Sequence, residues 1–487
     1  MTDGRAEALE TLIGSDESSI EVAERFDSTV VTIRVGRGSE RLALALANLL
    51  VRLGTRLSLE GAEMPSAPSR LDCYLRKFIE PRLTEGSDLP TRCTRFVVDV
   101  GFSGTNADLY VSSDGWNLSV SRDPHPVLSG KGPAVNAAAA LAASIIFREL
   151  LPELPSTALA DVTLEWNLVN YELRHTARIS RAGPVMATCF GGGSVGSSTI
   201  YTLLLSEAEG VIDLVDPDTL EERNRWRYPA FLSESSGPKT GWLEGLAADS
   251  TLRVQGHQTD AANYIFDLED SAPALAISAV DSIAARRDIT DLLARTTINV
   301  GVNRLSFHVS RHLFGDESGC LYCPFLDVSD PADEVDVYAE MTDLSRGRIR
   351  ELLRGDVISE ADLAVMHVSV SGDSVQFPVD EFRAFVRRYL YAQAPVAIAG
   401  GEVAVSAPFV SALAGSLAAA EVLKEAAGGE DGVDRRVDVD CSGFPTGFQR
   451  AVRRDESRKC LCWDPRRLKK YASLWGPPPS AVGVRHG

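Results

Sequence analysis

The sequence predicts an α/β protein whose sheets are mainly parallel, and three observations support this prediction. Strand-like runs of β-branched and apolar residues alternate with helix-like runs, which is typical of folds whose helices cover a parallel sheet. A glycine-rich turn, 191–196, lies between a strand-like run and a helix-like run. Two such series of alternating strands and helices each end in a long Ala-rich apolar segment, 132–151 and 407–426. We therefore expect two α/β regions in one chain.

Length and composition limit the class of protein. The 487 residues predict two or three domains. With 44% hydrophobic residues the chain can build more than one core, which excludes wholesale disorder. Its formal net charge of −19 disfavours nucleic-acid binding, because phosphate backbones repel it. No apolar run reaches the ~18 residues that a membrane helix needs, and the first residues carry no secretory signal. We therefore expect a cytoplasmic protein without nucleic-acid or membrane partners.

The first region begins with an acidic segment, 1–27, whose apolar residues recur at helical spacing and predict a surface helix. Residues 28–155 are predicted to form an N-terminal α/β domain, and 156–182 a connection. Strands are expected at 29–35, 56–59, 96–100 and 108–111, and helices at 42–53 and 134–151.

The second region is predicted to be a nucleotide-binding domain, 183–440, followed by a C-terminal segment, 441–487. A strand at 185–190 leads into the glycine-rich turn, and the next helix is expected at 198–206. Further strands are expected at 211–215, 274–280 and 437–440, and the last long helix at 405–426.

The closing helices of the two regions resemble each other. Segments 132–151 and 407–426 share their length and Ala spacing, which indicates an internal duplication. We hypothesise that 28–155 are a degenerate, catalytically inactive copy, because its first strand leads into Arg37 and Arg41 and has no glycine phosphate cradle. The alternative is an unrelated α/β domain that recruits substrate.

The glycine-rich turn is the first candidate binding site. Gly191, Gly193 and Gly196 would allow a tight turn in which backbone amides approach a phosphate at the N-terminus of the next helix. The following strand ends in Asp216, twenty residues after Gly196. A carboxylate there can accept hydrogen bonds from ribose hydroxyls. These features predict a Rossmann-like nucleotide site without identifying the nucleotide.

Charged and polar residues after that strand narrow the choice of nucleotide. Asp218, Asn224, Arg227 and Lys239 follow in order. A triphosphate needs cations to neutralise its phosphates, whereas a nicotinamide cofactor leaves this cluster without a role. A later strand ends in Asp281, where a carboxylate above the sheet is well placed for Mg²⁺. The sequence therefore favours a triphosphate with its magnesium ion.

In these motifs the sequence resembles the ThiF/MoeB/HesA superfamily, which includes the ubiquitin-activating enzymes. The superfamily pattern joins a G-x-G-G-x-G loop, a D-x-D pair with N-x-x-R downstream, a Lys after a glycine turn, and D-N-x-x-x-R. The matching stretches are 191–196, 216–218, 224–227, 237–239 and 281–286, and the resemblance covers roughly residues 183–470. It implies that Asp216 holds the ribose of ATP and Asp281 holds Mg²⁺. It also implies that Asn224, Arg227 and Lys239 bind the phosphates.

Three residues depart from the superfamily pattern. Ser194 stands where the loop has another glycine, Tyr228 where a Gln usually follows the Arg, and Ser282 where an Asn follows the Asp. None of these changes removes a charged group. We therefore expect an active enzyme.

Two short cysteine pairs predict a zinc-ribbon-like metal site. Cys320 and Cys323 form one pair and Cys460 and Cys462 the other. Four thiolates suit tetrahedral Zn²⁺, and two turns that each present two sulfurs make a closed structural site. The resemblance agrees, because members of the superfamily often carry a structural zinc with one pair near the C-terminus.

The resemblance implies an ATP-dependent adenylyltransferase, in which a carboxylate attacks the α-phosphate of MgATP to give an acyl adenylate and pyrophosphate. The carboxylate is commonly the C-terminus of a ubiquitin-like or sulfur-carrier protein, or of a peptide. Many members are dimers in which each subunit lends an Arg to the other's ATP, so we expect a homodimer or a monomer that acts as a pseudo-dimer. Cys189 is expected in the core. Cys441 is the best candidate for a reactive thiol, although a structural role is favoured, and we expect adenylation without an obligatory enzyme thioester.

Two other functions compete with this interpretation. One is a catalytically inactive scaffold that keeps the adenylation fold to bind a partner. The other is a dinucleotide-dependent oxidoreductase, which rests on the glycine loop and Asp216 alone and leaves the cysteine pairs without a role.

Overall fold

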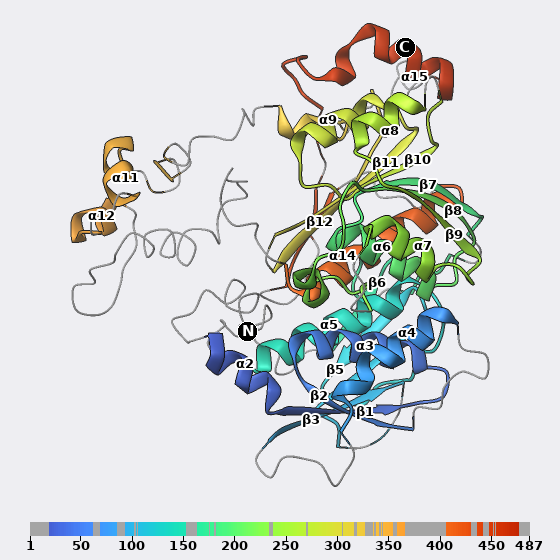
Figure 1. The fold of residues 1–487 in the computed structure, drawn as a ribbon, viewed down its shortest axis with the longest axis vertical. Coiled ribbons are helices and arrows are strands. Elements are labelled where there is room, and N and C mark those ends of the chain that lie inside the picture. The colour runs from blue at the N-terminus through green and yellow to red at the C-terminus, as the bar shows by residue number, and fades with distance from the viewer. Residues whose placement is uncertain are drawn as a thin grey trace. The chain divides into compact units, whose positions relative to one another are not determined.

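The structure is a computed structural model, shown in Figure 1. It describes residues 19–61, 69–84, 93–101, 104, 106–151, 163–174, 176–179, 182–232, 237–268, 271–303, 305–315, 319–326, 335, 338–339, 342, 344–353, 358–365, 406–429, 436–441, 448–450, 452 and 454–476. Residues 1–18 of the expected N-terminal helix lie outside this range, as do residues 156–162, 175 and 180–181 of the expected connection. The chain divides into two compact units. The larger unit includes Glu17–Pro324 and Val405–Gly487, and the smaller unit includes Phe325–Ala404.

The first sheet of the larger unit has the strand order β2-β1-β3-β4-β5-β6. Its strands are β1 (Thr29–Val35), β2 (Arg56–Glu60), β3 (Thr94–Val100), β4 (Leu109–Ser113), β5 (Asn117–Ser121) and β6 (Leu164–Asn167). The accompanying helices are α2 (Ser19–Asp27), α3 (Glu40–Leu53), α4 (Arg70–Ile79), the 3₁₀ turn η1 (Glu80–Arg82) and α5 (Pro133–Glu149). The first four strands in this order are parallel, and β5 and β6 are antiparallel to their neighbours.

The second sheet has the strand order β14-β13-β12-β11-β10-β7-β8-β9. Its strands are β7 (Val185–Phe190), β8 (Gly210–Val215), β9 (Leu252–His257), β10 (Leu275–Ser278), β11 (Thr296–Asn303), β12 (Ser306–His312), β13 (Arg436–Asp440) and β14 (Phe448–Arg450). Its helices are α6 (Ser194–Leu205), α7 (Lys239–Leu246), α8 (Ala261–Asp267), α9 (Ile283–Asp291), α14 (Pro408–Ala426) and α15 (Pro465–Trp475). The neighbouring strands β9, β8, β7, β10 and β11 are parallel to one another. Strands β12, β13 and β14 each pair antiparallel with the strand before them. The predicted α/β class with mainly parallel sheets is confirmed.

The two sheets share one pattern of strand pairing. The order β2-β1-β3-β4-β5-β6 corresponds to β8-β7-β10-β11-β12-β13, with three parallel pairs followed by two antiparallel pairs in each. In each sheet a helix follows the first strand, α3 or α6, and an Ala-rich helix follows the hairpin, α5 or α14. The second sheet adds β9 at one edge and β14 at the other. This is the pairing that the hypothesis of an internal duplication requires.

Helices α5, α6 and α14 form a closely packed layer that joins the two sheets (Figure 1). Small residues permit the close approach. A Cβ atom on Gly415 of α14 would lie 2.6 Å from the backbone of Ser198 in α6. Asn136 of α5 is fully buried and donates to Thr202 at 2.8 Å and to the carbonyl of Ala412 at 3.2 Å. The two Ala-rich segments, which form α5 and α14, therefore pack against each other and connect the two regions of the larger unit.

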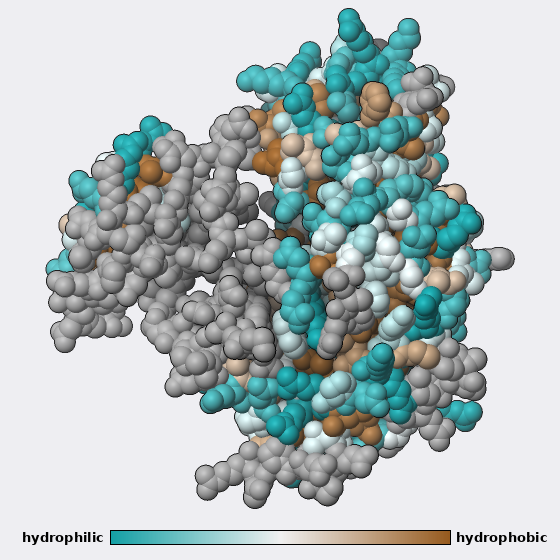
Figure 2. Space-filling view, viewed as in Figure 1, coloured by the Kyte–Doolittle hydropathy of each residue, from teal (hydrophilic) through white to brown (hydrophobic). Residues whose placement is uncertain are grey.

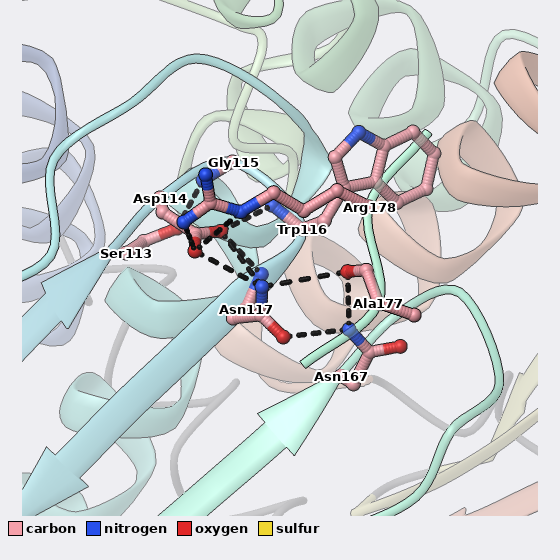
Figure 3. Close-up of polar contacts among 8 residues, drawn as sticks. All are labelled: Ser113, Asp114, Gly115, Trp116, Asn117, Asn167, Ala177 and Arg178. Atoms are coloured by element: carbon pink, nitrogen blue, oxygen red, sulfur yellow. Dashed lines mark hydrogen bonds and ion pairs between the residues drawn. The ribbon is translucent and has the colours of Figure 1, made fainter. Parts of the chain in front are cut away.

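Figure 3 shows how the connection between β6 and β7 is held to the first sheet. Asp114, in the turn between β4 and β5, accepts a hydrogen bond from the amide of Asn117 at 2.8 Å and pairs with Arg178 at 2.6 Å. The side chain of Asn167 donates to the carbonyl of Ala177 at 2.7 Å. Burial opposes ionisation of Asp114, but its hydrogen bonds with Asn117 and Arg178 outweigh burial and lower its pKa. These contacts hold residues 177 and 178 of the connection against the first sheet.

The smaller unit contains two described helices, α11 (Arg346–Leu353) and α12 (Glu360–Val365). Arg348 pairs with Asp362 at 2.8 Å, and the hydroxyl of Ser359 accepts from the amide of Asp362 at 3.2 Å. The ion pair links the two helices, and the hydrogen bond to Ser359 caps the start of α12.

The surface in view in Figure 2 carries hydrophilic side chains over much of its described part, with smaller hydrophobic areas between them. Among large apolar side chains, Met186 and Phe266 are exposed, at 60% and 83%. No helix of the described chain has the length and hydropathy needed to span a bilayer.

A buried ion pair on α14 lies against the segment that follows β6. Lys424 and Glu421 are 0% and 2% exposed and form an ion pair on consecutive turns of α14. Lys424 also donates to the carbonyl of Val169 at 2.9 Å, and Tyr171 donates to Glu421 at 2.6 Å. Burial and the charge of Glu421 raise the pKa of Tyr171, so this hydroxyl keeps its proton.

We expect Lys424→Met to destabilise the larger unit by about 3–5 kcal/mol, because it leaves the Glu421 carboxylate buried without its cation. The double variant Lys424→Met/Glu421→Met should lose less, since it removes both charges. Urea unfolding followed by tryptophan fluorescence compares the two. Lys131→Ala is the control, because its ion pair with Glu207 is exposed on both sides and should contribute about 1 kcal/mol or less. A double variant less stable than the single one would contradict this account.

Candidate functional site

The glycine loop lies between β7 and α6, at the carboxyl ends of the parallel strands. Gly191 has a φ of 96°, and a Cβ atom there would lie 2.6 Å from the carbonyl oxygen of Ala279. A Cβ atom on Gly196 would lie 1.8 Å from the carbonyl oxygen of Gly191. Larger side chains are excluded at both positions. Gly193 is the N-cap of α6. Ser194, which departs from the superfamily pattern, is the first residue of this helix and needs no unusual backbone conformation.

Asp216 connects the glycine loop to the end of β8. Its carboxylate accepts from the amide of Gly192 at 2.6 Å and from the amide of Asp218 at 2.8 Å. The ammonium of Lys239 lies 3.7 Å away. Burial raises the pKa of Asp216, while Lys239 and the two amides oppose that rise. Each carboxylate oxygen has a second lone pair and can still accept from a ligand hydroxyl.

Lys239 is a buried cation beside this loop. Its side chain is 8% exposed, and its ammonium pairs with Asp218 at 2.6 Å, whose own side chain is 64% exposed. Burial opposes the charged ammonium, but the hydrogen bond to Asp218 and the charge of Asp216 outweigh it and raise the pKa of Lys239. Lys239 is therefore a permanent positive charge at physiological pH.

Asn224 and Arg227 come from the 3₁₀ turn η2 (Glu222–Trp226) and the residue after it. Asn224 is buried, and its side-chain oxygen accepts from the amide of Glu221 at 2.9 Å. Its amide nitrogen is therefore the atom that can donate to a ligand. Arg227 is half-buried, with its guanidinium carbon 5.8 Å from the centre of the Tyr228 ring.

Tyr228 lies between the predicted phosphate-binding residues, and the sequence had singled it out only as a departure from a pattern. The ammonium of Lys239 lies 6.0 Å from its ring centre. Its hydroxyl oxygen lies 3.8 Å from the place where a Cβ atom on Gly193 would stand. Burial raises the pKa of Tyr228 against the opposing charges of Lys239 and Arg227. Its position directly after Arg227 was the sequence signal that could have identified it.

Asp281 lies after β10, the strand next to β7, and its side chain is exposed. The loop before it contacts the glycine turn, because the amide of Ala279 donates to the carbonyl of Phe190 at 2.9 Å. Arg286 donates to the carbonyl of Asp281 at 2.9 Å and so supports this loop through its backbone. The Asp281 carboxylate thus shares the sheet edge with the glycine loop, without a described direct contact to Lys239.

The structure brings one group of predicted residues into direct contact and leaves others nearby. The contacting group is Gly191, Gly196, Asp216, Asp218 and Lys239, around the backbone of Gly192 and Ala279. Gly193, Asn224 and Arg227 join it around Tyr228, and Asp281 lies at the same sheet edge. In the first region, Arg41 pairs with Glu207 at 2.6 Å, at the opposite end of α6 from the glycine loop.

The four paired cysteines come together in a second candidate site. Cys320 and Cys460 have their sulfurs 3.4 Å apart, and Cys323 and Cys462 3.6 Å apart. All four sulfurs lie within 4.8 Å of one another. Sulfurs bound to tetrahedral Zn²⁺ at ~2.3 Å would lie about 3.8 Å apart. This donor set and spacing fit a Zn²⁺ ion.

The other thiols of interest are buried. Cys441 is 1% exposed and Cys189 is 0% exposed, and burial raises the pKa of each to about 12. The charge of Asp440 adds to the effect at Cys441. The expected core position of Cys189 is therefore confirmed, and Cys441 lies in surroundings unsuited to a nucleophilic thiol.

Comparisons with known proteins give distant matches. No protein-family model matches the chain. It is 25% identical over 495 residues to the "Uncharacterized protein y4jF" of Sinorhizobium fredii, covering 93% of this chain and 91% of the relative. Among solved structures it is similar to E. coli MccB in a crystal structure with succinimide, with 16% identity, a TM-score of 0.37, and 57% and 67% of the two chains covered. It is also similar to PaaA, with 15% identity, a TM-score of 0.30, and 55% and 72% covered.

We expect Cys441 to resist alkylation in the folded protein while the exposed Cys73 reacts. With a pKa of about 12, about one Cys441 thiol in ten thousand is ionised near pH 8, and burial also blocks access to it. Timed iodoacetamide labelling with peptide mass mapping measures both rates. Unfolded protein is the control, in which the two thiols should react alike. Equal labelling in the native state would show that Cys441 is accessible.

Proposed function

We propose that this chain is an ATP-dependent adenylyltransferase that activates a C-terminal carboxylate as an acyl adenylate. The observation that carries the proposal is Lys239, a buried cation held by Asp216 and Asp218 beside a glycine loop. Such a charge, next to backbone amides at a helix N-terminus, suits the phosphates of a nucleoside triphosphate.

In the proposed reaction, a carboxylate oxygen of the substrate attacks the α-phosphorus of ATP. The bond from that phosphorus to the oxygen bridging the α- and β-phosphates breaks, and pyrophosphate leaves with the electron pair. Lys239, Arg227 and the amide nitrogen of Asn224 are the proposed phosphate ligands, which neutralise charge as the leaving group departs. Asp216 would accept from the ribose hydroxyls, and Asp281 would supply a carboxylate oxygen to Mg²⁺.

The proposed substrate is a ubiquitin-like or sulfur-carrier protein, or a peptide, that ends in a free carboxylate. An enzyme thioester is not part of the proposal, because Cys441 and Cys189 are buried and their pKa values raised. The first region is proposed to replace a second subunit, which the shared strand pairing of the two sheets supports.

We expect the purified protein to catalyse ATP–pyrophosphate exchange that depends on a carboxylate substrate. Lys239→Ala and Asp281→Ala should each lower the exchange rate by about a hundredfold or more, as loss of a transition-state charge contact does. Lys131→Ala is the matched control, since this exposed lysine pairs with Glu207 away from the loop. Gly-terminated carriers and peptides are the substrates to screen. Failure of the wild-type protein to bind MgATP would overturn the proposal, and binding without exchange over that screen would favour the inactive scaffold.

The four clustered cysteines are proposed to hold one structural Zn²⁺, which joins the loop after β12 to the segment before α15. We expect one zinc per chain by elemental analysis of the purified protein. Cys323→Ser or Cys462→Ser should lower both the zinc content and the thermal midpoint, whereas Cys73→Ser, at an exposed cysteine, should change neither. A protein that folds normally and contains no stoichiometric zinc would refute this assignment.

A further inference from the structure

Arg52 is a fully buried arginine that the first region directs into the second. It lies on α3 and is 1% exposed. Its guanidinium donates to three backbone carbonyls, those of Pro229 at 3.0 Å, Phe231 at 2.8 Å and Arg225. All three carbonyls belong to the segment 225–231, which contains Arg227 and Tyr228. Arg52 therefore holds the backbone of a segment that carries proposed nucleotide ligands.

Neighbouring side chains of the first region orient Arg52. Asn48, one turn earlier on α3, accepts from Nε of Arg52 at 3.0 Å and itself donates to Pro229 at 3.0 Å. The Phe78 ring of α4 lies 4.4 Å from the guanidinium carbon. Burial lowers the pKa of Arg52 to about 9, which still leaves it charged near neutral pH. A buried charge of this kind is tolerated because several acceptors surround it.

A second contact holds the same segment from α7. The indole of Trp242 donates to the carbonyl of Ala230 at 3.0 Å, and its ring lies edge-on to Tyr74 of α4 at 5.4 Å. Lys239 is the first residue of α7. Helices α3 and α4 therefore contact both pieces of chain that carry the proposed phosphate ligands.

We propose that Arg52 is a positioning residue for the nucleotide site, through which the first region sets the conformation of the segment 225–231 and the place of Arg227 and Tyr228. This inference rests on the proposed function and deepens it. The first region would then contribute to nucleotide binding through backbone hydrogen bonds, without itself touching the nucleotide. Arg52→Met fills a similar volume and removes every hydrogen bond from the guanidinium to the three carbonyls, whereas Arg52→Lys keeps a charge that can reach one of them.

Equilibrium binding of MgATP and amide hydrogen exchange of 222–232 together test the proposal. Arg52→Met should raise the Kd for MgATP about tenfold or more and accelerate exchange in this segment. Arg52→Lys should recover part of both effects. Tyr171→Phe is the control, because it removes a hydrogen bond between the same two regions, to Glu421 of α14, and should change neither quantity. A folded Arg52→Met with a wild-type Kd would overturn the proposal.

Two further outcomes separate this proposal from the function on which it rests. If the wild-type protein binds no MgATP, the adenylation function fails, and with it the role of Arg52 in nucleotide binding. If the wild type binds MgATP but exchange in 222–232 is unchanged in Arg52→Met, the positioning role alone fails. Should Arg52→Met not fold, Asn48→Ala removes the second donor to Pro229 and should raise the Kd about threefold. An unchanged Kd in that variant would also count against the proposal.

Discussion

Helices α5 and α14 meet along faces of alanine and other small residues, and the two sheets are joined through this contact. Each helix also packs against the antiparallel part of its own sheet, α5 on β4 and β5, and α14 on β11 and β12. Small side chains bring these backbones close enough for Asn136 of α5 to donate to the carbonyl of Ala412 in α14 at 3.2 Å. The two sheets therefore belong to one compact unit in spite of their repeated topology.

This close approach explains why charged groups cross the boundary between the regions. Where water is excluded from the contact between the two regions, a buried polar group needs hydrogen-bond partners from the protein itself. Glu421 binds Tyr171, Lys424 binds the carbonyl of Val169, and Arg52 binds the carbonyl of Phe231. These contacts fix one relative orientation of the two regions, which apolar packing alone would specify less sharply.

Local patterns in the sequence predicted the parts of the fold that depend on local chemistry. The glycine turn, the acids that end β8 and follow β10, and the two Ala-rich helices were visible because residue type and spacing encode them. The cysteine pairs, 140 residues apart, were predictable because thiols in pairs have few other uses. Helix α4 and strand β5 were not predicted, although the Ser69–Asp72 capping box at the start of α4 is a local signal that spacing records. Arg52 could not be found from sequence, because its acceptors are main-chain carbonyls that no side-chain pattern records.

The arrangement of the two acids around Lys239 has a consequence for ligand binding. Asp216 is buried and committed to two backbone amides, so it cannot leave without disturbing the glycine loop. Asp218 is 64% exposed and can turn into solvent at little cost. Under the proposed function, a phosphate would displace Asp218 from the ammonium while Asp216 stays in place. Since a phosphate carries more charge than one carboxylate, the exchange favours the ligand electrostatically, and the exposed acid keeps the buried cation paired between rounds of binding.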